Sequence, residues 1–383
     1  MKLVHLANFN STNVGNGALI HGLEKTMEED FSISIDWDRE PWDDYTFGLR
    51  DFDQDFVDKI NQSDGLIVGG AVTFNGRDYN DRTGTRFELP FQYWNKIKKP
   101  VVFYGLSYRC WKGQEYHHLD KLKRTLEKIL SYENMLLSVR NDGTREWLKE
   151  KTGIESDKIE VVPDSALYVM AEDGIEIPEI IDERKNIIIS FNDEDREFRY
   201  RSKGESYKTV NQPREHVLGG LVETAEHLAE VIPANFILCP HYFDDYRMLS
   251  DFIASISPRI AHQMTVSTGL CRVKDTGRFY ARYREADLAI SMRVHSMSPC
   301  IGLGTPMVPY TTQDRMTSFL DKAGLSDIEV DAFSVDSSFS LLEKARYMLD
   351  NPSEIRIKFK KSYDSMREVT RKFHKRVKEL LLS

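Results

Sequence analysis

The sequence lacks several features that would place a protein in a class at once. Its 383 residues contain no apolar run approaching 18 residues, so no membrane-spanning helix is predicted. Its four cysteines, Cys110, Cys239, Cys271 and Cys300, form no Cys-x-x-Cys pair. This scarcity argues against a zinc site or a disulfide framework and favours a reducing, cytoplasmic environment. The opening residues, MKLVHLANFN, also lack the long apolar core of a secretion signal.

An excess of positive charge is missing too. The net charge is −9, which argues against general nucleic-acid binding, because phosphate backbones are captured by basic surfaces. A local basic pocket is still compatible with this balance. Hydrophobic residues make up 40% and charged residues 30% of the chain, which is typical of a folded soluble protein. No repeat of fixed period is visible, and the length predicts two domains rather than one core.

Short apolar runs alternate with longer amphipathic segments along the chain. The runs are continuous rather than alternating, which is typical of strands buried on both faces of a parallel sheet. The predicted strands cover residues 2–9, 64–70, 100–107, 135–140, 158–163, 186–192, 235–241, 286–292 and 306–310. Segments such as 121–131 and 216–231 predict helices between them. The alternation favours an α/β fold with doubly wound parallel sheets.

The strand series pauses over residues 168–186, which are acidic and punctuated by proline. We interpret this stretch as a linker. The prediction is therefore an N-terminal Rossmann-like domain over 1–170 and a C-terminal one over 185–335. A helical segment over 336–383 follows, which can pack back on the domain junction.

In an open parallel sheet, ligands bind beyond the carboxyl ends of the strands. Glycines follow two predicted strands at such ends, Gly15 and Gly17 after 2–9 and the Gly69–Gly70 pair at the end of 64–70. We interpret Gly15 and Gly17 as permitting tight turns before a helix whose first N–H groups suit an anion. An ordinary glycine-rich strand-to-helix turn is the alternative.

Charged residues end other strands. Arg140 is the last residue of the run 135–140, where it either binds an anionic ligand or forms a salt bridge inside its own domain. Asn141 or Asp142 is predicted to cap the following helix. Arg293 and His295 follow 286–292 with the same parity, so in an extended segment both side chains would point one way.

These residues predict a site for a compact anion of more than one charge. The guanidinium groups of Arg140, Arg293 and Arg315, the last at a helix start, match carboxylate and phosphate geometry. The imidazole of His295 titrates near neutrality and can move protons.

One long polar segment, residues 193–214, follows the predicted strand 186–192 and carries charges of both signs. Segments of this length are usually either lids or solvated excursions. The sequence leaves both readings open.

Seven segments, taken in order, resemble those of polysaccharide pyruvyl transferases over about residues 1–330. They are NVGNGAL, DGLIVGG, VVFYGLS, LSVRNDGTREWL, VVPDSAL, CPHYFDD and ADLAISMRVHSMSPCIGLGTPMVPY, of which the last, with its R-x-H block, is the most specific. The resemblance implies two Rossmann-like domains facing across a cleft, as in GT-B glycosyltransferases. It also implies transfer of the enolpyruvyl group of phosphoenolpyruvate onto sugar hydroxyls of a cell-surface glycan or its precursor. Such a reaction forms a pyruvate ketal and releases phosphate.

The resemblance further implies roles for individual residues. Arg140, Arg293 and His295 would be catalytic, with His295 as acid/base and the arginines as an anion clamp. The residues implied to bind substrate are Arg315, Asn13, Gly15, Asn16, Gly69, Gly70, Asp164 and His241. Phosphoenolpyruvate would be the donor substrate, with no cofactor required and no metal-ligand spacing visible. The acceptor would be a sugar or a lipid-linked glycan, which leaves peripheral membrane contact open.

The chain departs from the family pattern at three places. Asn16 stands where an aspartate is usual, Ala71 replaces the third glycine of a triplet, and Arg315 replaces a frequent lysine. These departures concern the acceptor more than the donor chemistry.

Two other functions remain as alternatives. A GT-B glycosyltransferase using a nucleotide sugar would have the same fold, but SMSPCIGLG contains no acidic residue to grip ribose hydroxyls. A non-catalytic protein that binds an anionic ligand would not need His295 beside Arg293.

Overall fold

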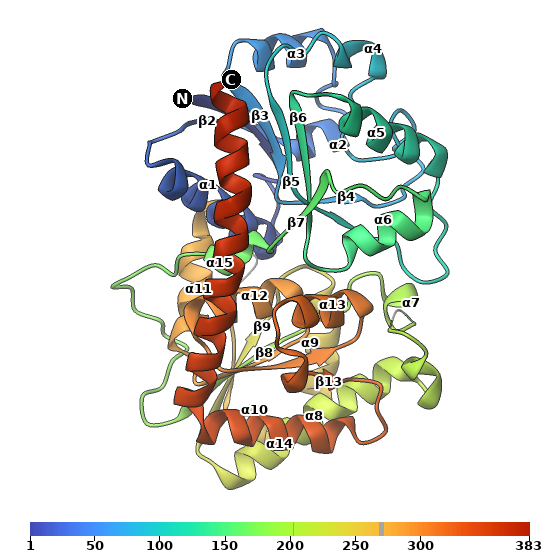
Figure 1. Cartoon of the computed structure of the whole chain (residues 1–383). Coiled ribbons are helices and arrows are strands. Elements are labelled where there is room, and N and C mark those ends of the chain that lie inside the picture. Colours follow the sequence, from blue (N-terminus) through green and yellow to red (C-terminus); the bar gives the residue numbers. More distant parts are fainter. Residues whose placement is uncertain (202, 268–271) are drawn as a thin grey trace. The chain divides into compact units, whose positions relative to one another are not determined.

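The computed structural model describes residues 1–201, 203–267 and 272–383 and divides the chain into two units (Figure 1). Unit 1 contains Met1–Ser11, Leu19–Ser165 and Met366–Ser383, and unit 2 contains Thr12–Ala18 and Ala166–Ser365. Each unit is built around its own parallel sheet. The predicted fold class, two doubly wound α/β units followed by a helical C-terminus, is confirmed.

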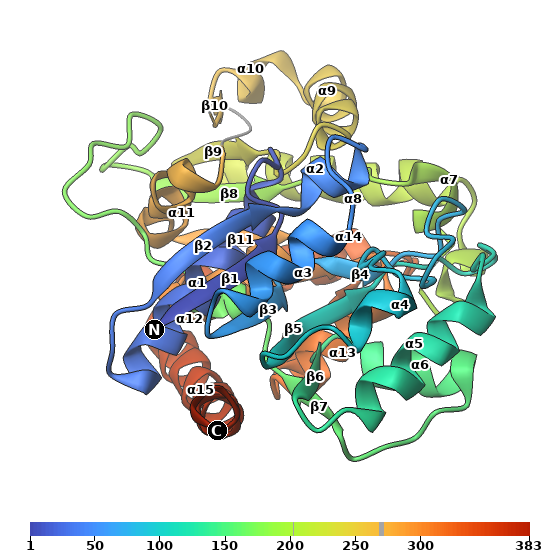
Figure 2. The same cartoon turned by 90° about the horizontal axis from the view of Figure 1, so that it is seen from above.

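Unit 1 contains a sheet of order β2-β1-β3-β5-β6-β7, with β4 paired to β5, and every strand pair is parallel (Figure 2). The strands are β1 (Lys2–Ala7), β2 (Asp36–Pro41), β3 (Gly65–Gly69), β4 (Val72–Phe74), β5 (Val101–Tyr108), β6 (Met135–Arg140) and β7 (Ile159–Val162). The helices are α1 (Val14–Phe31), whose first turn belongs to unit 2, α2 (Trp42–Thr46), α3 (Gln54–Asn61), α4 (Phe91–Trp94), α5 (Leu119–Ser131) and α6 (Thr144–Thr152).

Both faces of this sheet are buried, which explains the continuous apolar runs. Side chains of one parity, including Leu3 and Ile67, pack with residues of α1 and of the C-terminal helix. Side chains of the other parity, including Val4 and Leu66, pack in a separate cluster with residues of α3 and α5. Because successive side chains of a strand point to opposite faces of the sheet, each strand contributes to two cores, one on each face.

Unit 2 contains a parallel sheet of order β10-β9-β8-β11-β12-β13. The strands are β8 (Lys185–Ser190), β9 (Ala234–Cys239), β10 (Met264–Val266), β11 (Leu288–Ser291), β12 (Met307–Thr311) and β13 (Val330–Asp331). The helices are α7 (Arg196–Arg199), α8 (Pro213–Val231), α9 (Asp245–Ser255), α10 (Pro258–Ala261), α11 (Thr276–Glu285), α12 (Val294–Leu303), α13 (Asp314–Lys322) and α14 (Ser337–Asp350).

The C-terminal helix α15 (Pro352–Leu382) runs unbroken for 31 residues and is drawn in red in Figure 1. Pro352 begins it, in the first turn, where the missing N–H of proline costs nothing. Its first part belongs to unit 2, and the part from Met366 onward belongs to unit 1. Within the described ranges, none of the helices has the length and hydropathy needed to cross a membrane.

All nine predicted strands are present, and the four that sequence did not predict are peripheral. They are β2, β10 and β13 at sheet edges and the three-residue β4 beside β5. An edge strand is not buried on both sides, so it needs no apolar run. The sequence of β2, DWDREP, is accordingly charged and mostly exposed or half-buried.

The unit boundary differs in detail from the predicted domains. It falls at Ser165/Ala166, and residues 168–186, interpreted as a linker, lie within unit 2. In this stretch the buried Glu179 carboxylate pairs with Arg282 of α11 at 2.8 Å. A carboxylate held in this way anchors the segment to the folded unit rather than leaving it in solvent.

Candidate functional site

Arg293 is held by a buried carboxylate at the carboxyl edge of the unit 2 sheet. The residue directly precedes α12 and is 7% exposed. Its Nε donates to Asp245 Oδ2 at 3.1 Å, and its Nη2 donates to the other oxygen of the same carboxylate. Nε also donates to the Phe191 carbonyl at 3.1 Å. This bidentate contact fixes the guanidinium plane.

Asp245 is the first residue of α9, and it was missed by the sequence prediction. Its Oδ2 also accepts the backbone N–H groups of His241 at 2.8 Å and Tyr242 at 3.0 Å. Burial raises the pKa of Asp245, against the opposing effect of Arg293. Burial works against the charge on Arg293, but Asp245 and Glu194 together raise the pKa of its guanidinium. The only sequence signal was the acidic pair in CPHYFDD, directly after a strand.

His295 lies in the first turn of α12, so the expectation of an extended segment through both residues is wrong. Only Arg293 is extended, with φ −138° and ψ 143°, and the helix begins at Val294. The helix was hard to see because none of its residues is exposed, so its sequence shows no polar face. The Tyr280 hydroxyl donates to the His295 carbonyl at 2.6 Å, which ties this turn to α11.

Gly15 packs directly against the His295 imidazole. A Cβ atom at Gly15 would lie 2.7 Å from His295 Cγ, closer than real Cβ contacts allow. A Cβ at Gly17 would similarly collide with the side chain of Thr276. Both glycines are helical residues of α1, so the expectation that they form tight turns is wrong. They are needed because a neighbouring side chain comes so close.

His241 is fully buried beside these groups. Its Nε2 lies 2.7 Å from the Tyr283 hydroxyl, and its Nδ1 has no hydrogen-bond partner among the described residues. Burial, followed by the positive charges of Arg293 and His295, holds its pKa well below the usual value. His241 is therefore neutral at physiological pH and lies within electrostatic reach of both residues.

In unit 1, Arg140 pairs with Asp164. The two side chains are almost fully buried, with Arg140 Nε 3.2 Å from Asp164 Oδ2. This is the internal salt bridge considered as the alternative for Arg140. The Asp164 N–H also donates to Asn141 Oδ1 at 3.0 Å.

The expected cap at Asn141 or Asp142 is wrong. Gly143, with φ +84°, occupies the N-cap position of α6. Asp142 instead accepts hydrogen bonds from the Ser107 hydroxyl at 2.7 Å and the Thr144 hydroxyl at 2.5 Å. Its carboxylate therefore joins two strand ends to the start of the helix.

The remaining predicted residues also lie at strand ends or helix starts. Asn13 precedes α1, and its Oδ1 accepts the Gly15 N–H at 3.0 Å, as an N-cap side chain does. Asn16 donates its backbone N–H to the Asn13 carbonyl at 3.0 Å. Gly70 follows β3 with φ +66°, a conformation that favours glycine, and Arg315 lies in the first turn of α13.

The structure thus assembles two sets of predicted residues, one in each unit. Gly15, His241, Arg293 and His295 gather in unit 2. Arg140 and Asp164 pair in unit 1, where Gly69 ends β3. The joint action of Arg140, Arg293 and Arg315 on one anion stays a prediction.

A sequence model of the polysaccharide pyruvyl transferases matches residues 13–314, most of the chain. The chain belongs to the polysaccharide pyruvyl transferase family. The match spans the residues of both sets, from Asn13 to Arg293 and His295, and ends at Asp314. None of the curated proteins compared matches the chain significantly.

Solved structures resemble this family member in fold. An OtsA apo structure has a TM-score of 0.53 at 12% identity, covering 96% of this chain and 98% of that one. UDP-GlcNAc 2-epimerase from Methanocaldococcus jannaschii has a TM-score of 0.50 at 13% identity, covering 92% and 93%. The N-terminal domain of Candida albicans trehalose-6-phosphate phosphatase also has a TM-score of 0.50, at 12% identity, covering 99% and 96%. At such identities the likeness shows the GT-B-like fold alone.

In this family member, the long polar segment 193–214 is anchored by its own charges. Arg214 Nε donates to Asp193 Oδ1 at 3.0 Å, and the Tyr200 hydroxyl donates to the same oxygen at 2.9 Å. Lys203, 6% exposed, pairs with Glu329 at 2.6 Å. Ser202 lies outside the described residues. The segment is therefore tied to unit 2 at these residues, while others, including Arg196, Glu197 and Arg201, are exposed to solvent.

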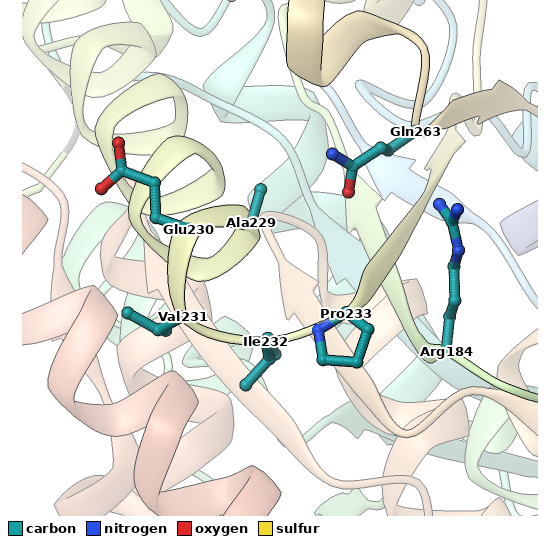
Figure 3. A pocket seen from close by; sticks show the side chains of 7 residues that line it. All are labelled: Arg184, Ala229, Glu230, Val231, Ile232, Pro233 and Gln263. Carbon is teal, nitrogen blue, oxygen red and sulfur yellow. The ribbon is translucent and has the colours of Figure 1, made fainter.

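One open hollow of about 440 Å³ lies at the opposite, amino-terminal edge of the unit 2 sheet. Figure 3 shows Arg184 and Gln263 on one side of it and Glu230 extending away. The residues that line the hollow include no histidine and a single arginine, Arg184. The hollow therefore offers no chemistry comparable to that around Arg293. In the part of the chain that the structure describes, no group of three or more His, Cys, Asp or Glu side chains could hold a metal. Cys271 lies outside that part.

Proposed function

We propose that this chain transfers the enolpyruvyl group of phosphoenolpyruvate onto two hydroxyls of a glycan or glycan precursor, in the cytoplasm. The products are a cyclic pyruvate ketal and inorganic phosphate. The observation that carries the proposal is the Arg293–Asp245 pair with His295 two residues further on, in a chain that belongs to this family.

The reaction balances with protons alone. The methylene carbon of phosphoenolpyruvate takes up one proton and becomes a methyl group, which leaves positive charge on the adjacent carbon. One sugar hydroxyl adds to that carbon and loses its proton. The C–O bond to phosphate then breaks, and phosphate leaves with the electron pair. A second hydroxyl adds in its place, and the two released protons replace those taken by carbon and phosphate.

His295 is the proposed acid/base. A histidine titrates close enough to neutrality to give a proton to the methylene carbon and to take one from a hydroxyl. Gly15 leaves room for the imidazole but limits its position, because the ring rests against the backbone of α1. His241 stays neutral and is proposed to bind substrate.

Arg293 is proposed to hold the carboxylate or phosphate of the donor. Its orientation is set before substrate arrives, because Asp245 binds it through both oxygens. A preorganised cation stabilises the charge that develops on the leaving phosphate without further reorganisation. Arg140 and Arg315 are proposed to complete the anion clamp, with Arg140 held by its ion pair with Asp164.

The test is release of phosphate from phosphoenolpyruvate across a panel of sugars and lipid-linked glycans. We expect release that depends on acceptor, together with an acceptor mass gain that matches one pyruvate ketal. Consumption of a nucleotide sugar without phosphoenolpyruvate would instead establish the glycosyltransferase alternative. Binding of phosphoenolpyruvate without turnover on any acceptor would favour the binding-only alternative.

A further inference from the structure

Unit 1 contains a cavity of about 210 Å³ that the proposed chemistry does not use. Two segments line it, one running from α2 to the start of α3 and one following β4. Its lining includes Tyr45, Thr46, Tyr79, Asp81, Arg82 and Arg86. Both segments follow carboxyl ends of strands, the edge at which open parallel sheets bind ligands.

Arg86 is a partly buried cation whose hydrogen-bond partners are all neutral. Its Nη2 donates to Asn8 Oδ1 at 3.1 Å and to Thr46 Oγ1 at 3.2 Å, and its Nη1 donates to the Val72 carbonyl at 3.4 Å. Its guanidinium also lies over the Trp42 ring, 5.0 Å from the centroid. Among the described residues, no carboxylate lies within ion-pair distance of this guanidinium.

This arrangement favours an external anion. A guanidinium has five N–H donors, and these three hydrogen bonds leave donors for a further oxygen. Burial lowers the pKa of Arg86, against the opposing effect of the Asp43 carboxylate, which lies beyond ion-pair distance. A carboxylate or phosphate in the cavity would pair with the guanidinium directly.

The rim of the cavity offers what sugar hydroxyls and a sugar ring need. Tyr79 is 56% exposed and presents an aromatic ring, and the exposed Asp51 and Asp81 carboxylates can accept hydrogen bonds. Arg82 adds donors beside them, with its Nη2 3.6 Å from Asp51. Donors, acceptors and an aromatic face together suit an amphipathic, hydroxylated ring better than a small ion alone.

We propose that this cavity binds a single acidic sugar unit, a pyranose carrying a carboxylate or a phosphate group. Arg86 takes the anionic group, and the rim takes the hydroxyls and the ring face. Its volume lies below the about 300–1,000 Å³ of sites for drug-sized ligands, which fits one ring rather than several. That this unit belongs to the glycan acceptor rests on the proposed function; the binding itself does not.

The test is equilibrium binding to the full chain, measured by calorimetry. The probes are glucuronate, glucose 1-phosphate, glucose, inorganic phosphate and phosphoenolpyruvate. We expect glucuronate or glucose 1-phosphate to bind more tightly than glucose. Arg86→Gln should weaken that binding by about 10- to 100-fold, the range for a charge-assisted bidentate contact. Arg124→Gln is the matched control, because Arg124 also lies over an aromatic ring of unit 1, 4.6 Å from the Phe91 centroid, but outside the cavity.

Tyr79→Ala is a second test that does not depend on the Arg86 variant folding correctly, because Tyr79 is exposed and its loss should not disturb the fold. It should weaken acidic-sugar binding several-fold while leaving the melting temperature unchanged. Three results would overturn the inference: glucose binding as well as glucuronate, Arg86→Gln binding like wild type, or only phosphoenolpyruvate and inorganic phosphate responding to Arg86→Gln. Acidic-sugar binding without any phosphate release would reject the proposed function and leave this site standing. If both Arg86→Gln and Tyr79→Ala turn over with an unchanged KM for the acceptor, this site is rejected and the proposed function stands.

Discussion

At the scale of single residues, the structure shows which groups hold the proposed substrate-binding residues in place. Arg293 is preceded by a short strand and followed by a helix, so its backbone alone does not fix the guanidinium. Asp245 does, through both carboxylate oxygens, while the same carboxylate binds two backbone N–H groups of its own loop. One buried charge thus joins β9, α9 and the start of α12.

Asp245→Asn should therefore impair donor binding more than acceptor binding. An amide keeps one acceptor for the backbone but loses the charged bidentate contact, so Arg293 should be held less firmly, through contacts such as that with the Phe191 carbonyl. We expect the KM for phosphoenolpyruvate to rise by tenfold or more, while the KM for the acceptor stays within about twofold. Steady-state kinetics in both substrates measure this. Asp244→Asn, at the neighbouring position and paired with Arg247 at 3.2 Å, is the control. Equal rises in both KM values would reduce Asp245 to a structural role.

His295→Gln should leave the fold intact and lower kcat by about 10²–10⁴-fold, the usual range for general acid/base catalysis. Glutamine can keep hydrogen bonds but cannot exchange a proton at neutral pH. The exposed His227 of α8 provides the control, and His227→Gln should be silent. A His295→Gln enzyme with near-normal kcat would make the residue a packing group.

Gly15→Ala should act through His295. The added methyl group cannot be accommodated without moving the imidazole, whose Cγ would lie 2.7 Å away. We expect kcat to fall by at least tenfold with little change in the KM for phosphoenolpyruvate. Gly219→Ala is the matched control, because it is a helical glycine of unit 2 with open space around its Cβ position. That control should be neutral or slightly stabilising.

At the scale of elements, α15 is anchored to unit 1 by a buried network. His374 Nδ1 lies 2.6 Å from Asp30 Oδ2, and its Nε2 lies 2.8 Å from the Tyr104 hydroxyl. Arg367 donates to both Asp30 oxygens at 2.7 Å. Burial opposes ionisation of Asp30, but hydrogen bonds from His374 and Arg367 lower its pKa to about 2. Burial likewise lowers the pKa of His374, against the opposing effect of Asp30.

Both shifts predict loss of stability in acid. The folded pKa of Asp30 lies below its ordinary value of 3.8, so its contribution is complete above that pH and is lost as pH falls toward 2. The unfolded state also takes up a proton at His374 more readily, so stability already declines below pH 6.5.

Asp30→Asn should lower the free energy of unfolding at pH 7 by about 1–3 kcal/mol, because its partners lose a charged acceptor. The difference from wild type should shrink as pH falls from 4 to 2. Urea unfolding across this pH range measures it. Asp364→Asn, in the same helix but in an exposed pair with Lys360, should change stability by no more than about 0.5 kcal/mol. A difference that stays constant with pH would contradict the network's role.

At the scale of the whole molecule, neither unit is one continuous piece of chain. Residues 366–383 return to unit 1, where Phe373, Val377 and Leu381 pack in the same cluster as Leu3. Residues 12–18 belong to unit 2 and bring Gly15 to His295. Unit 2 therefore needs a segment from near the start of the chain, and unit 1 needs its end.

A chain shortened after residue 365 should fail to fold unit 1. Each of the three missing apolar side chains is worth about 2–5 kcal/mol in a core, and together they match the whole stability of a typical domain. Circular dichroism and urea unfolding would show this as loss of one cooperative transition. In the full chain, Phe373→Ala should destabilise by about 3–5 kcal/mol. Val369→Ala, at a position 41% exposed on the same helix, should be nearly silent. An unchanged transition in the shortened chain would show that the C-terminal segment is dispensable.

Much of this protein was determined by its sequence alone. Strands buried on both faces require continuous apolar runs, so the central strands and the α/β class were predictable from local composition. The R-x-H block and the segments around it were sufficient to indicate the family. The edge strand β2 was not predictable in the same way, because a strand with one free side can be charged.

The tertiary structure decided what each site residue touches. Asp245 and Arg293 are 48 positions apart, and no local pattern says that a carboxylate after β9 will meet a guanidinium after β11. Gly15 resembles a turn glycine in sequence, yet its role is set by an imidazole 280 positions away. Arg140 ends a strand as an anion ligand would, and only packing shows Asp164 against it. Local sequence determines which elements form, because burial and backbone preference act over a few residues. Contacts between distant residues depend on how strands are ordered in the sheet, and that order is settled only when the whole core packs.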